Sequence, residues 1–458
     1  MTIRRREFLK IFGATAATIS SAFGAAAGRT GKPNVLVVHA DQWRYHAMGC
    51  ADNADKNVRT PNLDKMAQEG VNWSRSYAVS PVCTPNRAVF MTSRYPHQTG
   101  MFHNDLQLPP TEKNCIADTF SSAGYKTCYI GKWHLDGPPK SGYVPKGWRR
   151  HGFQTFVGFN RGHSYDSSPT FDDDGTKASG YKRKWEPTAQ VNTAIDFMKQ
   201  NKARPWFVFL SWGPPHGPYK SQPGFEYTSK DIVPRPNVGN GEDINKLVPY
   251  FSMCSALDHE FGRLMNALKS MGVSKNTIVL FTADHGDMHG SHGKRHKNFP
   301  EEESAHIPCL MRFPSRVKDG QKISVPISTV DYMPTLLGLC GITVPGTCAG
   351  IDKSDLMLGG KQDSETSIYL VQNHKGTHWR AVVKGRYKYF VHSNDSDEKD
   401  PHLFDLDADP YELKNLVSDT KSKSVLSDMR KEYEGWQSRL KDVFPKKSPN
   451  LAKPSYTA

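Results

Sequence analysis

Short runs of consecutive apolar residues alternate along the chain with segments of mixed polarity. The apolar runs are rich in β-branched and aromatic residues and predict buried strands, at 33–42, 126–131, 206–212, 277–283 and 307–313. The mixed segments carry helix signals, such as Thr60 and Pro61 at a start and Gly70 at a stop. They predict helices at 60–70, 115–124, 188–201, 250–272 and 329–341. Strands that alternate with helices predict an α/β domain with a mostly parallel sheet.

The pattern changes after about residue 360. Closely spaced short strands are predicted in "SIYLVQ", "WRAVVKG", "RYKYFVH" and "HLFDL", followed by a polar helix at about 421–440. This texture predicts a small antiparallel α+β subdomain over 361–458, after the α/β domain of 28–360. The segment 137–187 is rich in Gly, Pro and Asp, and its length predicts a functional loop region.

Composition and charge narrow the class of protein. With 458 residues, 37% hydrophobic and 11% aromatic, the chain is typical of a folded globular protein. Its formal net charge of +14 favours an anionic partner. The Lys and Arg residues are scattered and form no nucleic-acid-binding motif, so an acidic small molecule or polysaccharide is the better prediction than nucleic acid.

The first 27 residues predict an export signal. Arg5 and Arg6 precede a short stretch rich in Ala, Gly and Ser and a cleavage site of the Ala25–Ala27 type, which resembles a twin-arginine signal peptide. The stretch is too short and too weakly apolar for a stable membrane span; an amphipathic helix or membrane anchor is the alternative. We therefore expect a protein exported to the periplasm or the cell exterior.

The chain has eight cysteines. Disulfides are permitted outside the cytoplasm. Cys340 could pair with Cys348, and Cys115 with Cys128, although spacing alone fixes no connectivity.

Polar side chains follow four of the predicted strands where each strand ends. They are Asp41 with Gln42, Lys132 with His134, His216, and Asp284 with His285. Because ligands bind at the carboxyl ends of parallel strands, we expect these groups to meet at one edge of the sheet. The oxygen ligands suit a hard cation such as Ca²⁺ or Mg²⁺, and the cationic groups suit a tetrahedral anion whose charge grows in a transition state.

One cysteine stands apart from the other seven. Cys83 comes directly before Thr84 and Pro85, which suit a helix start, where the dipole favours negative charge. Arg87 lies one turn into that helix. The alternative is that Cys83 is a buried structural cysteine. A helix N-terminus together with cations and a metal site is typical of enzymes that transfer sulfuryl or phosphoryl groups.

Four blocks resemble the type I, formylglycine-dependent sulfatase family. They are "CTPNR", "GYKTCYIGKWHLDG", "TADHGDMHGSHGKRHKNFPEEESAHIPCLMRF" and "LFDLDADPYELKNL". The blocks occur in the family's order and spacing, and the resemblance extends over nearly all of the mature chain. The resemblance implies an alkaline-phosphatase-like fold, with a large mostly parallel sheet sandwiched by helices and a small C-terminal subdomain.

The resemblance also implies site roles. Cys83 would be converted to Cα-formylglycine by a formylglycine-generating enzyme, and its hydrate would attack sulfur. One Ca²⁺ would be bound by that hydrate oxygen together with Asp41, Gln42, Asp284 and His285. Arg87 would polarise the hydrate, Lys132 and Lys297 would hold sulfate oxygens, His134 would take a proton from the second hydroxyl, and His216 would protonate the leaving alcohol.

Two positions depart from the family pattern. Asn86 stands where Ser or Ala is common, which bears on recognition by the modifying enzyme. Gln42 stands where a second Asp is frequent, so one negative charge fewer reaches the metal.

The loops suggest a sulfated, uronate-bearing carbohydrate as substrate. The candidate contact residues are Arg161, His163, Tyr165, Asp166, His374, Lys375, His378, Trp379 and Arg380; ordinary solvent exposure is the alternative for each.

Two other functions and one other metal site remain open from the sequence. A phosphodiesterase or phosphonate monoester hydrolase of the same superfamily can share the formylglycine. An unmodified Cys83 would suit a non-catalytic protein that binds sulfated glycans. A zinc cluster is a weaker alternative for Asp287, His289, His292 and His296.

Overall fold

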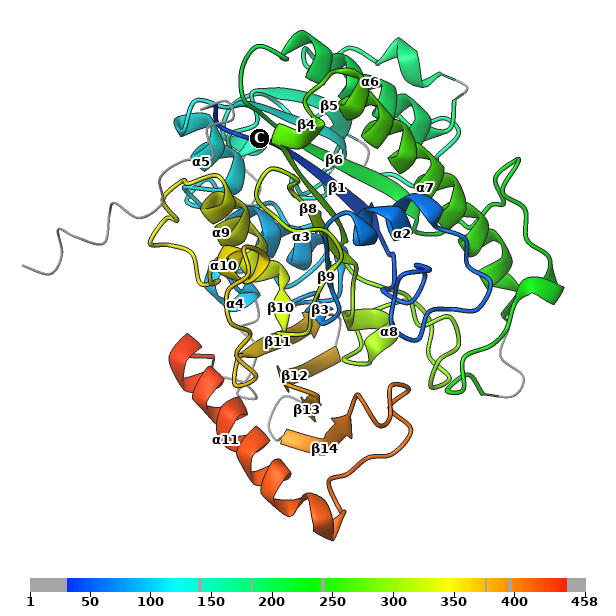
Figure 1. The fold of residues 1–458 in the computed structure, drawn as a ribbon, viewed down its shortest axis with the longest axis vertical. Coiled ribbons are helices and arrows are strands. Elements are labelled where there is room, and N and C mark those ends of the chain that lie inside the picture. Colours follow the sequence, from blue (N-terminus) through cyan, green and yellow to red (C-terminus); the bar gives the residue numbers. More distant parts are fainter. Residues whose placement is uncertain are drawn as a thin grey trace, which may run out of the picture. The chain divides into compact units, whose positions relative to one another are not determined.

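Figure 1 shows the computed structural model, which describes residues 31–138, 142–182, 184–239, 244–374, 377–393 and 398–442. The expected export signal lies outside the described residues. Within them, Pro33 onward belongs to one compact unit.

Eight strands of the described residues form the central sheet, in the order β5-β4-β6-β1-β7-β8-β2-β9. Their bounds are β1 Asn34–Asp41, β2 Val71–Trp73, β4 Lys126–Lys132, β5 Thr155–Phe159, β6 Trp206–Pro215, β7 Thr277–Ala283, β8 Cys309–Arg312 and β9 Gln321–Ile323. The strand β1 lies between β6 and β7 and runs parallel to both. All eight of its residues are buried, as its continuous apolar run predicts.

The helices cover both faces of this sheet. Their bounds are α2 Pro61–Gln68, α3 Cys83–Thr92, α4 Pro96–Thr99, α5 Ile116–Ser122, α6 Glu186–Gln200, α7 Leu247–Ser270, α8 Glu302–Ala305, α9 Thr329–Leu339, α10 Ser354–Met357 and α11 Lys423–Leu440. Figure 1 shows α2, α6 and α7 on one face and α3, α5 and α9 on the other. The predicted sandwich of helices around a mostly parallel sheet is therefore confirmed.

The described residues also form short 3₁₀ turns. They lie at Trp148–Arg150, Ser179–Tyr181, Ser229–Asp231, Ile244–Lys246, Ser274–Asn276 and Thr420–Ser422.

Two expectations about the sheet need correction. The strand β8, predicted as part of the parallel pattern, runs antiparallel to β7 and to β2. The segment 137–187, predicted as loop, contributes β5, which pairs parallel to β4. The backbones of β5 and β4 lie so close together that a Cβ on Gly158 would lie 2.2 Å from the carbonyl oxygen of Gly131. This close approach requires a glycine at position 158, and that glycine interrupts the apolar run of β5 in the sequence.

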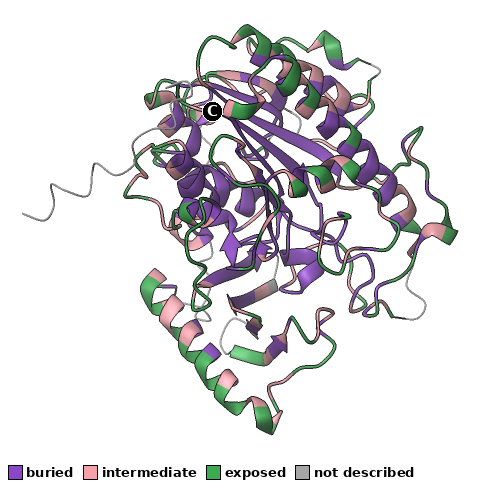
Figure 2. Ribbon diagram, in the orientation of Figure 1, coloured by how far each residue is buried: buried purple, intermediate pink, exposed green. Residues whose placement is uncertain are grey.

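A second sheet follows the central one in sequence. Its strands β11 Ser367–His374, β12 Thr377–Lys384, β13 Tyr387–Ser393 and β14 Glu398–Asp405 pair antiparallel in chain order. The helix α11 contacts β11, β12 and β13, and Figure 2 shows its far side exposed. The predicted antiparallel sheet with a polar helix is confirmed, and the domain boundary at residue 360 stays a prediction. A separate pair, β3 Ser76–Tyr77 and β10 Ile327–Ser328, runs parallel.

All eight cysteines are free thiols in the described structure. The proposed pairs Cys340–Cys348 and Cys115–Cys128 are therefore not formed. Cys115 instead contacts a ring nitrogen of His151, with 3.7 Å between Sγ and Nδ1.

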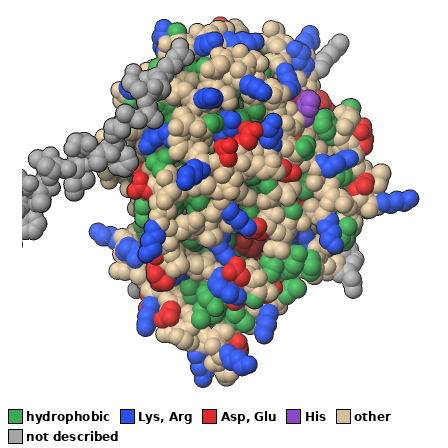
Figure 3. Space-filling model, viewed as in Figure 1, with side chains coloured by type: hydrophobic (Ala, Val, Ile, Leu, Met, Phe, Trp, Pro, Cys, Tyr) green, Lys and Arg blue, Asp and Glu red, His purple; other side chains and the backbone are tan. Residues whose placement is uncertain are grey.

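Two surface properties bear on partners. No helix among the described residues is both long enough and apolar enough to cross a bilayer. On the face drawn in Figure 3, Lys and Arg side chains are interspersed with acidic ones, without a continuous basic stripe.

Candidate active site

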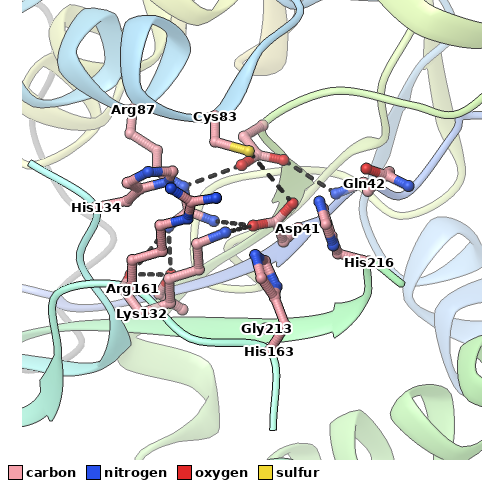
Figure 4. A network of polar contacts seen from close by, with 12 residues as sticks. Asp41, Gln42, Cys83, Arg87, Lys132, His134, Arg161, His163, Gly213 and His216 are labelled. Carbon is pink, nitrogen blue, oxygen red and sulfur yellow. Dashed lines mark hydrogen bonds and ion pairs between the residues drawn. The ribbon is translucent and has the colours of Figure 1, made fainter. Parts of the chain in front are cut away.

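The predicted residues meet at one edge of the central sheet. Asp41 ends β1 and Lys132 ends β4, while His216 follows β6 and Asp284 follows β7. These four strands are neighbours in the sheet and run parallel, so their carboxyl ends share an edge. Figure 4 shows the side chains of Asp41, Lys132 and His216 converging there.

Cys83 is the first residue of α3 and is 2% exposed. Its sulfur lies 3.3 Å from His285 Nε2, 3.3 Å from Lys297 Nζ and 3.8 Å from Asp41 Oδ1. Burial opposes ionisation, yet Lys297 and Lys132 hold the pKa of the Cys83 thiol well below its usual range. Position 83 thus faces both the cations and the carboxylates, which a buried structural cysteine does not require.

Asp41, Asp284, His285 and Cys83 form a metal-binding arrangement. One ligand atom of each lies within 4.8 Å of the others, and all four residues are buried. The Nδ1–H of His285 donates to the carbonyl of Gly286 at 2.9 Å, which leaves Nε2 facing the carboxylates, 3.4 Å from Asp284 and 3.6 Å from Asp41. A histidine whose second nitrogen is held by a carbonyl is oriented for a metal. The donor set fits one divalent cation.

Arg87 bridges the two carboxylates. Its guanidinium donates to Asp284 Oδ2 at 3.0 Å and to Asp41 Oδ2 at 3.2 Å, and to the Lys132 carbonyl and Ser211 Oγ. Burial opposes ionisation of Asp41, but Lys132 and other cations hold its pKa well below the usual range. Burial and the nearby Asp41 likewise oppose ionisation of Asp284, but His285 and Arg87 lower its pKa, so both carboxylates stay ionised, as metal ligands must be.

The lysines approach the site from different segments. Lys132 forms an ion pair with Asp41. Lys297 donates to Gln42 Oε1 at 3.0 Å as well as contacting Cys83. The remaining Gln42 group, Nε2, donates to Tyr219 Oη at 2.8 Å and to Asp287. The oxygen of Gln42 is thus held by a lysine, and its role as metal ligand stays a prediction.

The residues of "CTPNR" also hold the surrounding backbone. Thr84 Oγ1 donates to the carbonyl of His134 at 2.9 Å. Asn86 donates to the carbonyl of Asp284 at 2.7 Å and accepts from Thr329 at 2.6 Å. The asparagine that departs from the family pattern therefore fixes the strand end that carries a metal-ligand candidate.

His134 rests on a carboxylate that the sequence did not single out. Its Nε2 lies 3.1 Å from Asp105 Oδ1, and Asp105 also accepts two bonds from Arg161, at 2.5 and 2.7 Å. Asp105 lies in a loop, at φ 66°, and no motif or strand end marks it. The hydrogen bond from His134, and then those from Arg161, lower its pKa despite partial burial.

His216 completes the set. Its Nδ1–H donates to the carbonyl of Gly217 at 2.7 Å, so Nε2 is the nitrogen left for chemistry. Burial, and then the charge of Lys297, holds the pKa of His216 well below its usual range. The ring lines a cavity of about 560 Å³ shared with Gln42, Tyr219, Lys246 and His296.

The family follows from comparison with known proteins. The sulfatase family model matches residues 33–342. This chain belongs to the sulfatase family. A second model, N-sulphoglucosamine sulphohydrolase, C-terminal, matches residues 290–439. The sulfatase therefore has the alkaline-phosphatase-like fold expected from its sequence, and it is a sulfuric ester hydrolase.

Several relatives are similar over most of their length. An ulvan-active sulfatase of Formosa agariphila is 35% identical over 93% of this chain and 85% of its own. An endo-4-O-sulfatase of Bacteroides thetaiotaomicron is 29% identical over 87% and 91%. The crystal structure of a Bacteroides fragilis sulfatase has a TM-score of 0.83 at 27% identity, covering 92% of this sulfatase and 98% of that chain.

The predicted substrate-contact residues differ in how accessible they are to a substrate. Trp379 and Arg380 are buried: Trp379 Nε1 donates to the carbonyl of Asn298, and Arg380 pairs with Asp442 at 2.5 Å. These two predictions are therefore wrong. The ring of His374 lies 5.6 Å from that of His103, and His378 contacts Asn373.

Of the substrate-contact candidates predicted in the loop after β5, one is buried and another is exposed. Tyr165 is buried, and Asp166 forms an exposed ion pair with Lys220. Lys375 lies outside the described residues.

The suggested zinc cluster does not form. Asp287 accepts hydrogen bonds from Tyr219 and Gln42, whereas His292 is grouped with Glu303 and Glu412. His289 Nε2 lies 3.5 Å from Asp287 Oδ2, but His292 belongs to a different polar network, so the four predicted zinc ligands do not meet in the described part of the sulfatase.

Proposed function

We propose that this sulfatase removes sulfate from a sulfated carbohydrate, using residue 83 as Cα-formylglycine and one Ca²⁺. The observation that carries the proposal is the buried group of Asp41, Cys83, Asp284 and His285 at a helix start, flanked by Lys132 and Lys297. The names of the Formosa and Bacteroides relatives, ulvan-active sulfatase and endo-4-O-sulfatase, support a glycan as the substrate class.

Two groups beyond the genetically encoded side chains would take part, a modified residue 83 and a metal ion. Cα-formylglycine, made from Cys83 itself, would provide as its hydrate an oxygen nucleophile for sulfur and a second hydroxyl through which sulfate leaves. A bound Ca²⁺ would supply positive charge that favours ionisation of the nucleophile and offsets the charge of the sulfate group. Asp41, Asp284 and His285 would hold the ion, with Gln42 as a further oxygen donor.

The lysines supply the complementary charge for sulfate. Lys297 Nζ lies 3.3 Å from the Cys83 sulfur, which marks where the reacting oxygen would stand. Lys132 lies beside the metal-ligand candidate Asp41, with which it forms an ion pair. Lys132 is buried and Lys297 is half-buried, and cations so placed would stabilise the charge that develops as the S–O bond to the carbohydrate breaks.

The two histidines would handle the protons. His216 would donate a proton from Nε2 to the leaving oxygen, so that the carbohydrate departs as an alcohol. His134, oriented by Asp105, would accept the proton of the second hydroxyl at position 83 as sulfate is released. The negative charge of a bound sulfate ester between Lys132 and Lys297 opposes the cations that lower the pKa of His216, which favours its acid form.

The cavity beside His216 suits the leaving group. Its volume of about 560 Å³ lies in the range of small-molecule sites, and Tyr219 and Lys246 line it. A larger cavity of about 1020 Å³ is lined by Tyr45, His306 and Lys384 and contains none of the predicted catalytic residues. The smaller cavity is therefore the better candidate for the leaving-group site, because His216 lines it.

A desulfation screen tests the substrate class. Defined sulfated oligosaccharides, ulvan fragments among them, are compared with 4-nitrophenyl sulfate and a phosphodiester, and released sulfate and phosphate are measured. We expect sulfate release from at least one oligosaccharide. Hydrolysis of the phosphodiester alone would favour the phosphodiesterase alternative, and release of sulfate from 4-nitrophenyl sulfate but from no oligosaccharide would contradict a carbohydrate substrate.

Asp284→Ala should lose metal and activity together. The substitution removes a metal-ligand candidate and leaves the Arg87 charge less well paired. Metal content by elemental analysis and melting temperature are measured beside Asp166→Ala, which removes an exposed carboxylate. Asp284→Asn, which keeps the side-chain shape, separates loss of metal from loss of folding. Stoichiometric Ca²⁺ in folded Asp284→Asn or Asp284→Ala would mean that the ligands are misassigned.

We also propose that the protein is exported by the twin-arginine route to the periplasm or cell exterior. The Arg5-Arg6 pair and the Ala-rich stretch after it support this. Because that route moves folded proteins, a formylglycine-generating enzyme would act on Cys83 before export.

A further inference from the structure

A second imidazole lies against His216. The rings of His163 and His216 are stacked, with centroids 4.2 Å apart and planes 13° from parallel. His163 comes from the segment after β5, and His216 from the segment after β6 (Figure 4). His163 covers one face of the His216 ring, and His216 also lines the cavity proposed for the leaving group.

Tyr165 ties the two histidines together. Its hydroxyl donates to the carbonyl of His216 at 2.8 Å, with the carbonyl of Gly213 at 3.1 Å. The same oxygen lies 3.2 Å from His163 Nδ1. Since the hydroxyl proton is directed to a carbonyl, this oxygen accepts the Nδ1–H of His163. One buried tyrosine thus orients the side chain of His163 and the backbone of His216.

Gly213 makes this arrangement possible. A Cβ at residue 213 would lie 2.6 Å from Tyr165 Cε1, closer than real contacts allow, so the tyrosine ring fits only over a glycine. The ring of His163 carries no charge at neutral pH, because burial, and then Lys132, lowers its pKa to about 2. A neutral ring can pack against a protonated His216 without repelling it.

We propose that His163 is a positioning residue for His216: its ring, clamped by Tyr165, holds Nε2 of His216 toward the leaving oxygen. The inference rests on the proposed acid role of His216. Removing His163 should therefore lower the rate mainly for substrates with a poor leaving group. A leaving group that needs no proton is little affected when the general acid is misplaced. Small displacements of a catalytic group cost up to about 10²-fold in rate.

The test compares phenyl sulfate, whose leaving phenolate is the poorer, with 4-nitrophenyl sulfate. For His163→Ala we expect kcat/KM on phenyl sulfate to fall on the order of 10-fold or more, and the value on 4-nitrophenyl sulfate to change much less. His163→Phe keeps a flat ring without nitrogen atoms and should restore most of the loss. Equal losses for the two substrates, or a His163→Phe variant as poor as His163→Ala, would overturn the positioning role.

A double-mutant cycle separates this inference from its premise. If His163 acts through His216, adding His163→Ala to His216→Ala should cause no further loss on phenyl sulfate. An additive loss would instead mean that His163 touches the reacting groups itself. Equal losses for both substrates in His216→Ala would remove the acid role, whatever His163 does. Should His163→Ala fail to fold, Tyr165→Phe removes the clamping hydroxyl and must show the same leaving-group dependence.

Discussion

Cys83→Ala should abolish turnover, with kcat/KM falling about 10⁵- to 10⁶-fold, as when a nucleophile is removed. The lysines, Arg87 and both carboxylates remain, but no oxygen nucleophile can form at position 83. The rate is measured with 4-nitrophenyl sulfate and with the best oligosaccharide of the screen. Cys348→Ala is the matched control, because Cys348 is half-buried and lies outside the site.

Cys83→Ser sharpens this expectation. A serine hydroxyl can attack sulfur once, but a sulfated serine has no second hydroxyl through which to release sulfate. We expect at most one sulfate captured per chain and then no turnover. Continued turnover by Cys83→Ser or Cys83→Ala would contradict the role assigned to residue 83.

His216→Ala should slow release of a sugar alcohol by about 10²- to 10⁴-fold, the usual contribution of general acid catalysis. A sugar alkoxide is a poor leaving group and needs the proton that His216 Nε2 would supply. Nitrophenolate barely needs protonation, so the loss on 4-nitrophenyl sulfate should stay below about tenfold. The ratio of kcat/KM values for the two substrates is the measurement.

Lys132→Ala provides the comparison for that ratio. Lys132 would stabilise the sulfuryl group itself, which both substrates share, so its removal should damage both alike, by about 10²- to 10³-fold. Equal losses on both substrates for His216→Ala would leave His216 as a sulfate-binding or structural residue.

The central strands could be predicted because burial on both faces leaves a continuous apolar run. β1 is the best case, with "NVLVVHAD" buried throughout. An apolar run encodes burial but no direction, so the antiparallel orientation of β8 had no signal in "CLMR". The edge strand β5 was missed because Gly158, which lets the backbone approach Gly131, breaks the run.

The site could be predicted as far as strand ends and the helix start locate it. Asp41, Lys132, His216 and Asp284 follow strands, and their meeting follows from a parallel sheet. Contacts made by loops could not be predicted, because they depend on tertiary packing.

Three such contacts change the picture of the site. Asp105 reaches His134 from a loop residue at φ 66°. Gln42 turns its amide nitrogen to Tyr219. His163, predicted as a substrate contact, instead stacks on His216.

Peptide mass spectrometry of residue 83 tests the account most directly. Active protein is purified from its native host, digested, and the fraction of chains with an aldehyde at position 83 is compared with specific activity across preparations. We predict an aldehyde in place of the thiol, with activity proportional to the converted fraction. Fully active protein that carries only the intact Cys83 thiol would contradict the formylglycine mechanism.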